Sequence, residues 1–222
     1  MASDVLPVLR TGSPTAPTRS CAVRMRLATA TAVLALAAPG LLAAEPRSRD
    51  PAQVPAGDYV LDKPHASLIA RVPHLGFSRY TMRFDHLDGR FTYDPATWRN
   101  PQMTFEVDAA SVDTGDKAFD RQVAGYFDAE AYPKITFQAR SLEETGEGTG
   151  KLTGDLTLRG VTRPVTLDVT FNGAGPGMMG GGTRLGFSGT GRINRSDFGV
   201  NQVNQFVGDE VDLQFELEFY KK

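Results

Sequence analysis

The sequence predicts an all-β protein whose antiparallel strands either close into a barrel or pack on a second sheet. Two observations support this fold class. Apolar and polar residues alternate with a period of two through most of the chain after Tyr59, as in strands with one buried and one wet face. One segment alone, near residues 116–128, has a helical pattern, so too few helices are available to cover the apolar faces of the strands.

Residues 1–44 differ from the rest and are predicted to be an N-terminal extension followed by a secretory signal peptide. Arg26 precedes the apolar run LATATAVLALAA, and small residues follow as far as Ala44. This run is typical of a signal peptide and is shorter than the about 20 apolar residues of a membrane span. We therefore expect cleavage after Ala44, a linker over residues 45–56, one domain over residues 57–222 and a periplasmic location. A disordered tail is the alternative interpretation.

Without residues 1–44 the chain is acidic, with 20 Lys and Arg against 25 Asp and Glu, a formal charge of −5. Nucleic acids and anionic membranes bind clustered basic residues, so we expect neither as a partner. The one cysteine, Cys21, lies in the leader, which leaves the domain without disulfide or thiolate chemistry. No integral membrane span is expected in the mature chain, and its length suits one domain.

About eight strands are expected along the chain. Pro73 and Gly76 indicate that the first strand ends near His74. The later segments that alternate are 103–107, 135–139, 152–158, 165–171, 183–193 and 211–219. The turn signals between strands include Asp88-Gly89, Gly146-Glu147-Gly148 and Arg159-Gly160. Closing about eight strands leaves an interior that is filled by side chains or holds one small ligand, and the alternation leaves both possibilities open.

The short helical segment is expected near residues 116–128. Its apolar face consists of Phe119, Val123, Tyr126 and Phe127. Asp116 is a suitable N-cap, and Pro133 prevents the helix from continuing.

The three histidines of the chain, His65, His74 and His86, lie within one short region. They have none of the short spacings that are typical of a metal site, and no nucleophile stands beside them. We therefore expect neither a metal ion nor a catalytic histidine. The favoured interpretation is that these side chains fasten strand ends, with Asp62 as a partner for His65 and Asp85 as a partner for His86.

Three other patterns are weak signals of enzymatic chemistry. GPGMMG at 175–180 matches a dinucleotide motif, but a strand pattern follows it where a helix is required, so no cofactor is expected. This patch is interpreted as a plain hairpin loop or as a portal over a barrel mouth. GFSGTG at 186–191 lies within a strand pattern and lacks the turn of a nucleophile elbow. Glu106 and Asp108 share the polar face of one strand, which is typical of a solvated surface.

Several stretches of the chain are similar to the YceI-like family. They are YVLDKPHASLIARVPHLGFS (59–78), SVDT (111–114), AYPKITF (131–137), GDLTLRGVTRPVTLDV (154–169), INRSDFGV (193–200) and VGDEVDLQFELE (207–218). The resemblance runs from Tyr59 nearly to the C-terminus. It implies an eight-stranded antiparallel lipocalin-like barrel, in the periplasm, with an apolar cavity that binds an isoprenoid lipid of polyprenyl or quinone type. It implies no catalytic residues. Many members have Gly where this chain has Met82, a change that narrows the interior if Met82 points inward.

The alternation and the resemblance together predict a binding or carrier protein for an isoprenoid or other long apolar lipid, as a monomer or homodimer. Each buried CH₂ gains about 0.8 kcal/mol, so apolar walls are sufficient to hold such a chain. The predicted interior residues are Phe105, Phe137, Leu156, Leu167, Val169, Phe215 and Leu217. The predicted mouth or lid residues are Phe77, Phe84, Phe127 and Met178. The alternatives are an enzyme acting on an apolar lipid or amide in the same cavity, and a ligand-free, stress-related structural barrel.

Overall fold

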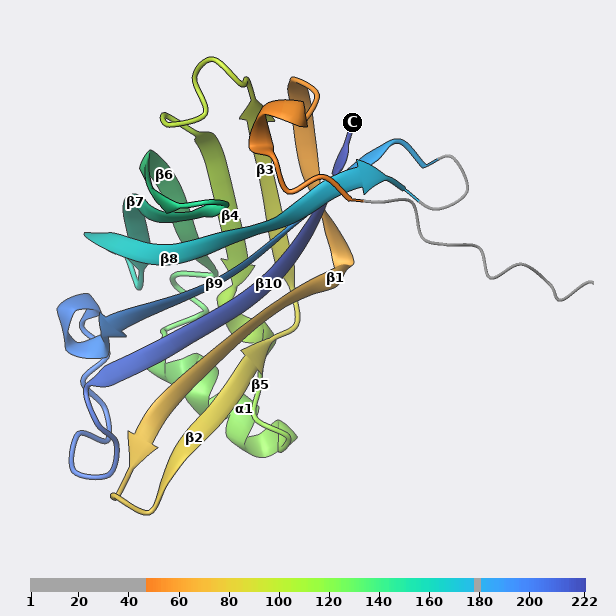
Figure 1. The fold of residues 1–222 in the computed structure, drawn as a ribbon. Helices are drawn as coiled ribbons and strands as arrows, with labels where there is room; N and C mark the ends of the chain where they lie inside the picture. Colours follow the sequence, from red (N-terminus) through yellow and green to blue (C-terminus); the bar gives the residue numbers. More distant parts are fainter. Residues whose placement is uncertain (1–46, 178–180) are drawn as a thin grey trace, which may run out of the picture. The chain divides into compact units, whose positions relative to one another are not determined.

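The structure, a computed structural model, describes residues 47–177 and 181–222 (Figure 1). The predictions made for residues 1–44, and the one made for Met178, therefore concern residues outside those described. The ten strands are β1 Gly57–His74, β2 Ser78–Phe84, β3 Leu87–Tyr93, β4 Gln102–Asp108, β5 Val112–Asp113, β6 Lys134–Gly146, β7 Thr149–Leu158, β8 Val161–Pro176, β9 Thr183–Asn194 and β10 Glu210–Lys221. The helices are η1 Pro51–Gln53, η2 Ala109–Ser111, α1 Lys117–Tyr126 and η4 Arg195–Phe198.

The strands form one antiparallel sheet that closes on itself, because β10 pairs with β1 (Figure 1). β3 pairs with residues 57–60 of β1 and β2 with residues 68–74, on the edge of β1 opposite β10. β2 and β3 therefore act as two halves of one broken strand, and β5 continues β4 in the same way beside β2. The closed barrel has eight strands by this count, so the predicted eight-stranded antiparallel barrel is confirmed.

The aromatic side chains of several strands meet inside the barrel at the end where β1 begins. The Tyr59 and Phe91 rings stack with centroids 5.2 Å apart, and Phe219 meets Phe91 edge-on at 5.0 Å. Phe187 packs against Phe91 and Phe219 with centroids 6.2 Å away. Edge-on and stacked pairs of this kind stabilise a core beyond the burial of their area. This end of the barrel is therefore a packed core, with Tyr59 and Phe219 fully buried.

Asp88-Gly89 is a turn signal that the structure contradicts, because both residues lie inside β3. Gly89 stands opposite Phe105 of β4, and a Cβ at Gly89 would lie 3.0 Å from Cδ2 of that ring. The glycine thus makes room for an inward aromatic ring. Gly154 serves Phe137 similarly, since a Cβ there would lie 2.5 Å from Cζ of Phe137. The turns predicted at 146–148 and 159–160 are confirmed.

The helix α1 begins where the sequence predicts. Asp116 is its N-cap, and its carboxylate accepts hydrogen bonds from the N–H groups of Ala118 and Phe119 at 2.8 and 2.9 Å. The helix ends at Tyr126, with Phe127 as its C-cap. Within residues 47–177 and 181–222, no helix has the length and apolar character needed to cross a membrane.

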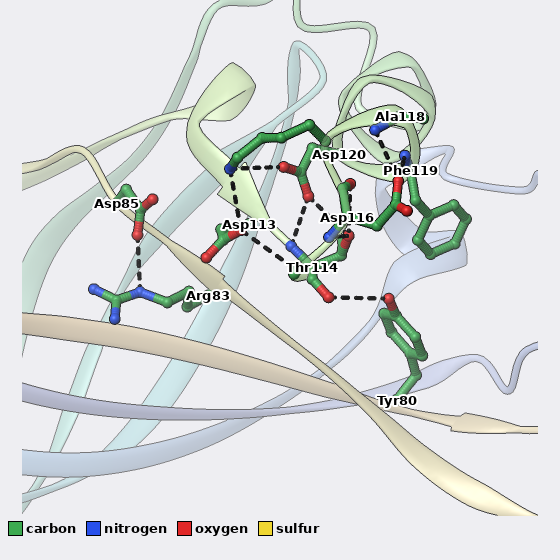
Figure 2. Close-up of polar contacts among 11 residues, drawn as sticks. Tyr80, Arg83, Asp85, Asp113, Thr114, Asp116, Ala118, Phe119 and Asp120 are labelled. Atoms are coloured by element: carbon green, nitrogen blue, oxygen red, sulfur yellow. Dashed lines mark hydrogen bonds and ion pairs between the residues drawn. The ribbon is translucent and has the colours of Figure 1, made fainter.

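A buried carboxylate ties α1 to the chain that precedes it (Figure 2). Asp120 is 7% exposed and accepts hydrogen bonds from the backbone N–H and the hydroxyl of Thr114, at 2.7 and 2.8 Å, and from Lys117 Nζ at 3.0 Å. The hydroxyl of Tyr80, on β2, reaches the Thr114 carbonyl at 3.5 Å. These bonds fix the position of α1 relative to β2 and β5.

Candidate functional site

The barrel encloses a cavity of about 790 Å³, within the range of roughly 300–1,000 Å³ that is usual for small-molecule sites. Its walls are the inward-facing residues of the strands, and the interior is therefore hollow. The predicted residues that line it are Phe84, Phe105, Phe127, Phe137, Leu156, Leu167, Val169, Phe215 and Leu217. Phe77 does not line it, because this side chain is 86% exposed in the turn between β1 and β2. The binding role of these residues stays a prediction.

The pleat of each strand decides which residues reach the cavity. On β8, Leu167 and Val169 line it, while Asp168 between them lies outside and pairs with Lys151 of β7 at 2.7 Å. Met82 also lines the cavity, so its side chain occupies space that a glycine would leave open.

The helix α1 contributes a further part of the wall. Its predicted apolar face, Phe119, Val123, Tyr126 and Phe127, lines the cavity. Gln122 joins this group and donates a hydrogen bond from Nε2 to the Tyr126 hydroxyl at 2.5 Å. α1 therefore supplies both apolar surface and a pair of neutral polar groups.

Formal charges occur near the ends of the cavity and not along its middle. Among the described lining residues, the carboxylates are Asp94, which follows β3, and Glu144, near the end of β6. Arg99 neutralises Glu144 at 3.2 Å. The one Lys or Arg among the described lining residues is Arg195, in η4. A long uncharged molecule therefore meets no unpaired charge over the central part of the barrel.

Arg195 organises the connection between η4 and β10. It is 8% exposed, and its guanidinium donates to the carbonyls of Val200, Gln202, Val207 and Gly208 at 2.6–3.1 Å and to Asn204 Oδ1 at 2.9 Å. These bonds occupy the guanidinium and hold residues 200–208 against the mouth of the cavity. Arg195 is thus a structural residue of the cavity mouth.

Gln202 lies on the same connection and lines the cavity. Its side-chain oxygen Oε1 is buried and has no hydrogen-bond partner among the described residues. A buried acceptor without a partner costs free energy, so this atom favours a ligand that brings a donor. The sequence did not predict Gln202, Val203 and Phe206 as lining residues, because residues 198–208 have no periodic pattern, nor did it predict Arg195 just before them. The one available signal is that this run contains no charged residue.

His65 occupies the outer face of β1 in a small polar cluster. Its Nδ1 lies 2.8 Å from Asp62 Oδ2, as predicted, and Arg184 contacts both Asp62 and Glu218. Burial raises the pKa of Asp62, but hydrogen bonds from Arg184 and His65 outweigh it and lower the pKa below its usual value. Asp62, His65 and Glu218 place ligand atoms within 4.8 Å of one another, yet Arg184 already provides the cation for both carboxylates.

The other two histidines have different surroundings. His86 Nδ1 lies 3.5 Å from Asp108, whereas Asp85 pairs with Arg83 at 2.8 Å, so the predicted partner Asp85 is wrong. The pairing of β3 with β4 brings Asp108 near, and the local sequence does not reveal that register. His74 ends β1 as expected and lines the cavity.

The two remaining motifs have structural positions. GFSGTG lies within β9, so it forms no strand-to-helix turn. Glu106 pairs with Lys134, and Asp108 accepts the Ala110 N–H at 2.9 Å at the start of η2. Both therefore act as surface and capping residues.

This arrangement defines a hollow, closed antiparallel barrel with an apolar interior cavity. The model of the YceI-like domain matches residues 59–219, and the chain belongs to the YceI-like family. A UPF0312 protein of Vibrio cholerae is 36% identical over 171 residues, covering 75% of this chain and 89% of that protein. A UPF0312 protein of Pseudomonas fluorescens is 39% identical over 178 residues, covering 76% and 89% respectively.

Solved structures share the same fold. BcnA of Burkholderia cenocepacia is 29% identical with a TM-score of 0.62, over 71% of this chain and 98% of that one. The YceI protein of Campylobacter jejuni is 29% identical with a TM-score of 0.59, over 68% and 90%. A polyisoprenoid-binding domain of Saccharophagus degradans is 18% identical with a TM-score of 0.56, over 74% and 98%, and is similar in fold.

Proposed function

We propose that this protein binds an isoprenoid lipid, of polyprenyl or quinone type, inside the barrel and serves as a periplasmic carrier or reservoir for it. The observation that carries the proposal is the apolar cavity of about 790 Å³, whose central walls hold no formal charge. An isoprenoid chain leaves water with a gain of about 0.8 kcal/mol for each CH₂-sized unit, so it needs apolar walls and no particular chemistry.

Two further points support an isoprenoid ligand. The Saccharophagus degradans barrel, which has this fold, is a polyisoprenoid-binding domain. A cavity with polar groups near its ends also suits a hydrocarbon chain with one polar head group, because the chain occupies the apolar middle and the head group stays near a mouth.

The two competing functions have less support. Nucleophilic catalysis on the ligand needs a nucleophile beside a base. Among the described lining residues, the ring of His74 lies 6.4 Å from that of Tyr80, between centroids, and the two side chains form no such pair. A purely structural barrel is expected to fill its interior to the density of a protein core, whereas this interior is hollow. Binding and transport are therefore favoured. The periplasmic location rests on the signal-like run before Ala44.

Filling the cavity tests the proposal. Val169→Trp places an indole in the central lining, and Thr170→Trp places the same side chain at an exposed position one residue away on β8. We expect Val169→Trp to bind a polyprenol at least about tenfold more weakly than the wild type, because the indole occupies space that the hydrocarbon chain of the polyprenol needs. The outward variant should bind as the wild type does.

Affinity is measured by isoprenoid-induced shift in melting temperature together with direct titration. Circular dichroism and the melting temperature without ligand check that both variants fold. Equal binding by the two variants, or no isoprenoid binding by the wild type, would contradict the proposed function.

A further inference from the structure

Three large apolar side chains are exposed at the end of the barrel where β1 ends. Leu75 and Phe77, in the β1–β2 turn, are 48% and 86% exposed, and Phe206, in the connection before β10, is 47% exposed. We call these three residues the apolar rim. Single exposed apolar residues are ordinary, but a group of them at one place marks an interaction surface.

Backbone hydrogen bonds hold the two segments of the rim together. The Leu75 N–H donates to the Phe206 carbonyl at 2.9 Å, and the Gly208 N–H donates to the Pro73 carbonyl at 2.8 Å. His74 and Val207 form an isolated β-bridge between these two bonds. Figure 1 shows the β1–β2 turn and the connection before β10 at the same end of the barrel. The rim is thus one surface, although its residues lie far apart in the sequence.

The rim is continuous with the cavity. Phe206 is half exposed and also lines the cavity, and Val203 and Val207 of the same segment line it beside Phe206. An apolar path therefore runs from the outer surface of the rim into the barrel. A lipid that follows this path exposes little of its chain to water.

The rim also lacks charge. No formally charged residue occurs between Arg71 and Arg79 or between Asp197 and Asp209. Arg79 at the border of the rim is paired with Asp212, which also binds Arg192. Contact of these two segments with a neutral bilayer surface therefore desolvates no formal charge of their own. The segments contain no Lys or Arg, the residues whose clusters bind anionic lipids.

We propose that the apolar rim docks on the surface of a neutral lipid bilayer and that the ligand passes between the bilayer and the cavity across it. This inference rests on the proposed function, because it assigns the membrane as the source of the cavity's ligand. An isoprenoid does not dissolve in water, so a carrier must collect it where it is dissolved. Leu75 and Phe77 enter the interface as apolar anchors, and Phe206 connects it to the interior.

The first experiment measures docking without the ligand. Trp98 is the one tryptophan of the chain, so Trp98→Phe with Phe77→Trp gives a protein with a single reporter in the rim. We expect its emission to shift to the blue with phosphatidylcholine vesicles and to be quenched by brominated phosphatidylcholine. The control carries Tyr220→Trp in the same background, since Tyr220 is 39% exposed on β10 away from the rim, and should show neither change.

The second experiment measures transfer. A fluorescent polyprenol is held in phosphatidylcholine vesicles with a quencher, and its release to the protein restores emission. The variant Leu75→Asn with Phe77→Ser leaves the cavity lining intact, and Asn suits the positive φ of 50° at Leu75. We expect the transfer rate to fall about tenfold, because two large apolar side chains no longer enter the bilayer. Affinity for farnesol added from solution should be unchanged.

The outcomes separate the two proposals. Wild-type transfer by the double variant, or a blue shift with native bacterial membranes and none with protein-free vesicles, would overturn the rim as a bilayer surface; the latter result indicates a protein partner. If the reporter docks on vesicles while no isoprenoid enters the barrel in either assay, the rim stands and the proposed ligand is wrong.

Discussion

Gln202 illustrates how a single buried atom sets a preference within an otherwise apolar cavity. Its Oε1 is buried at the mouth beside the apolar rim and has no partner among the described residues, whereas Arg195 on the same connection has all its bonds formed. A ligand that donates a hydrogen bond satisfies this atom, and one without a donor leaves it unsatisfied. For the isoprenoid ligand that we propose, this preference concerns the head group, because the hydrocarbon part is expected among the apolar walls.

Gln202→Leu is expected to remove this preference. The wild type should bind a polyprenol more tightly than its methyl ether by about three- to tenfold, the worth of one net hydrogen bond. In the variant the two affinities should converge. Gln205→Leu, at an exposed position of the same connection, is the matched control and should keep the ratio. Titration of both ligands provides the test. If Gln202→Leu keeps the wild-type ratio of polyprenol affinity to methyl-ether affinity, Oε1 does not bind the head group.

Asp62 gives a prediction on stability and not on binding, because it lies on the outer face of β1. The pKa of Asp62 is lower in the folded protein than the value of about 3.9 in the unfolded chain. The ionised carboxylate therefore stabilises the fold fully above about pH 3.9, and this stabilisation is lost as the pH falls through the pKa of the folded state. Asp62→Asn should therefore cost about 1–2 kcal/mol at pH 7 and progressively less below about pH 4. Urea unfolding between pH 3 and 7 measures the difference in the free energy of unfolding between the wild type and the variant. A constant difference across this range would contradict the assignment, and isoprenoid affinity at pH 7 should not change.

At the scale of elements, α1 is the part of the cavity wall that is held by few bonds. It contacts the barrel through its apolar face and through Asp120, whose pKa is lowered by hydrogen bonds from the Thr114 N–H and hydroxyl and from Lys117 (Figure 2). Most of the strands, in contrast, are hydrogen-bonded to a neighbouring strand on each side. Local opening of the wall is thus expected at α1 before the strands separate.

Asp120→Asn tests this. The amide keeps the shape but weakens the bonds to Thr114, so we expect faster hydrogen exchange over residues 117–126 and a lower isoprenoid affinity, with the strand amides little changed. Arg121→Met is the control, because Arg121 is an exposed residue of the same helix outside the bonds to Asp120. Hydrogen exchange followed by mass spectrometry resolves the two regions. Uniform loss of protection over the barrel would mean that α1 is not a separate unit.

Some features of the helices and strands could be predicted from the sequence, and others could not. Period-two alternation marked the inward residues of β4, β6, β7, β8 and β10, and the helical period marked the apolar face of α1, because strand pleat and helix periodicity are local properties. The break between β2 and β3 and the place of Gly89 depend on cross-strand neighbours, and a local pattern carries no such information. Gln202 and the rim depend on Arg195 and on bonds between distant segments, so only the structure brings them together.

At the scale of the whole molecule, the sheet closes and an aromatic core fills one end of the barrel, so the rest of the interior is hollow. We propose that a ligand enters this interior at the other end, between the β1–β2 turn and the connection before β10. The central claim is that this interior holds an isoprenoid. We propose that the protein meets its ligand in the periplasm, because the sequence predicts a secretory leader over residues 1–44. In a secreting bacterium we expect the protein in the periplasmic fraction with Glu45 as its first residue, as read by intact mass. A cytoplasmic product that retains residues 1–44 would contradict this.

The most direct test of the central claim is native mass spectrometry of the wild-type protein, purified from a bacterial periplasm without detergent, with organic extraction of whatever accompanies it. We predict one adduct of several hundred daltons for each barrel, which extracts as a polyprenyl or quinone lipid and is missing from Val169→Trp. A wild-type protein that shows only its own mass, and still does so after incubation with polyprenols and quinones, would contradict it.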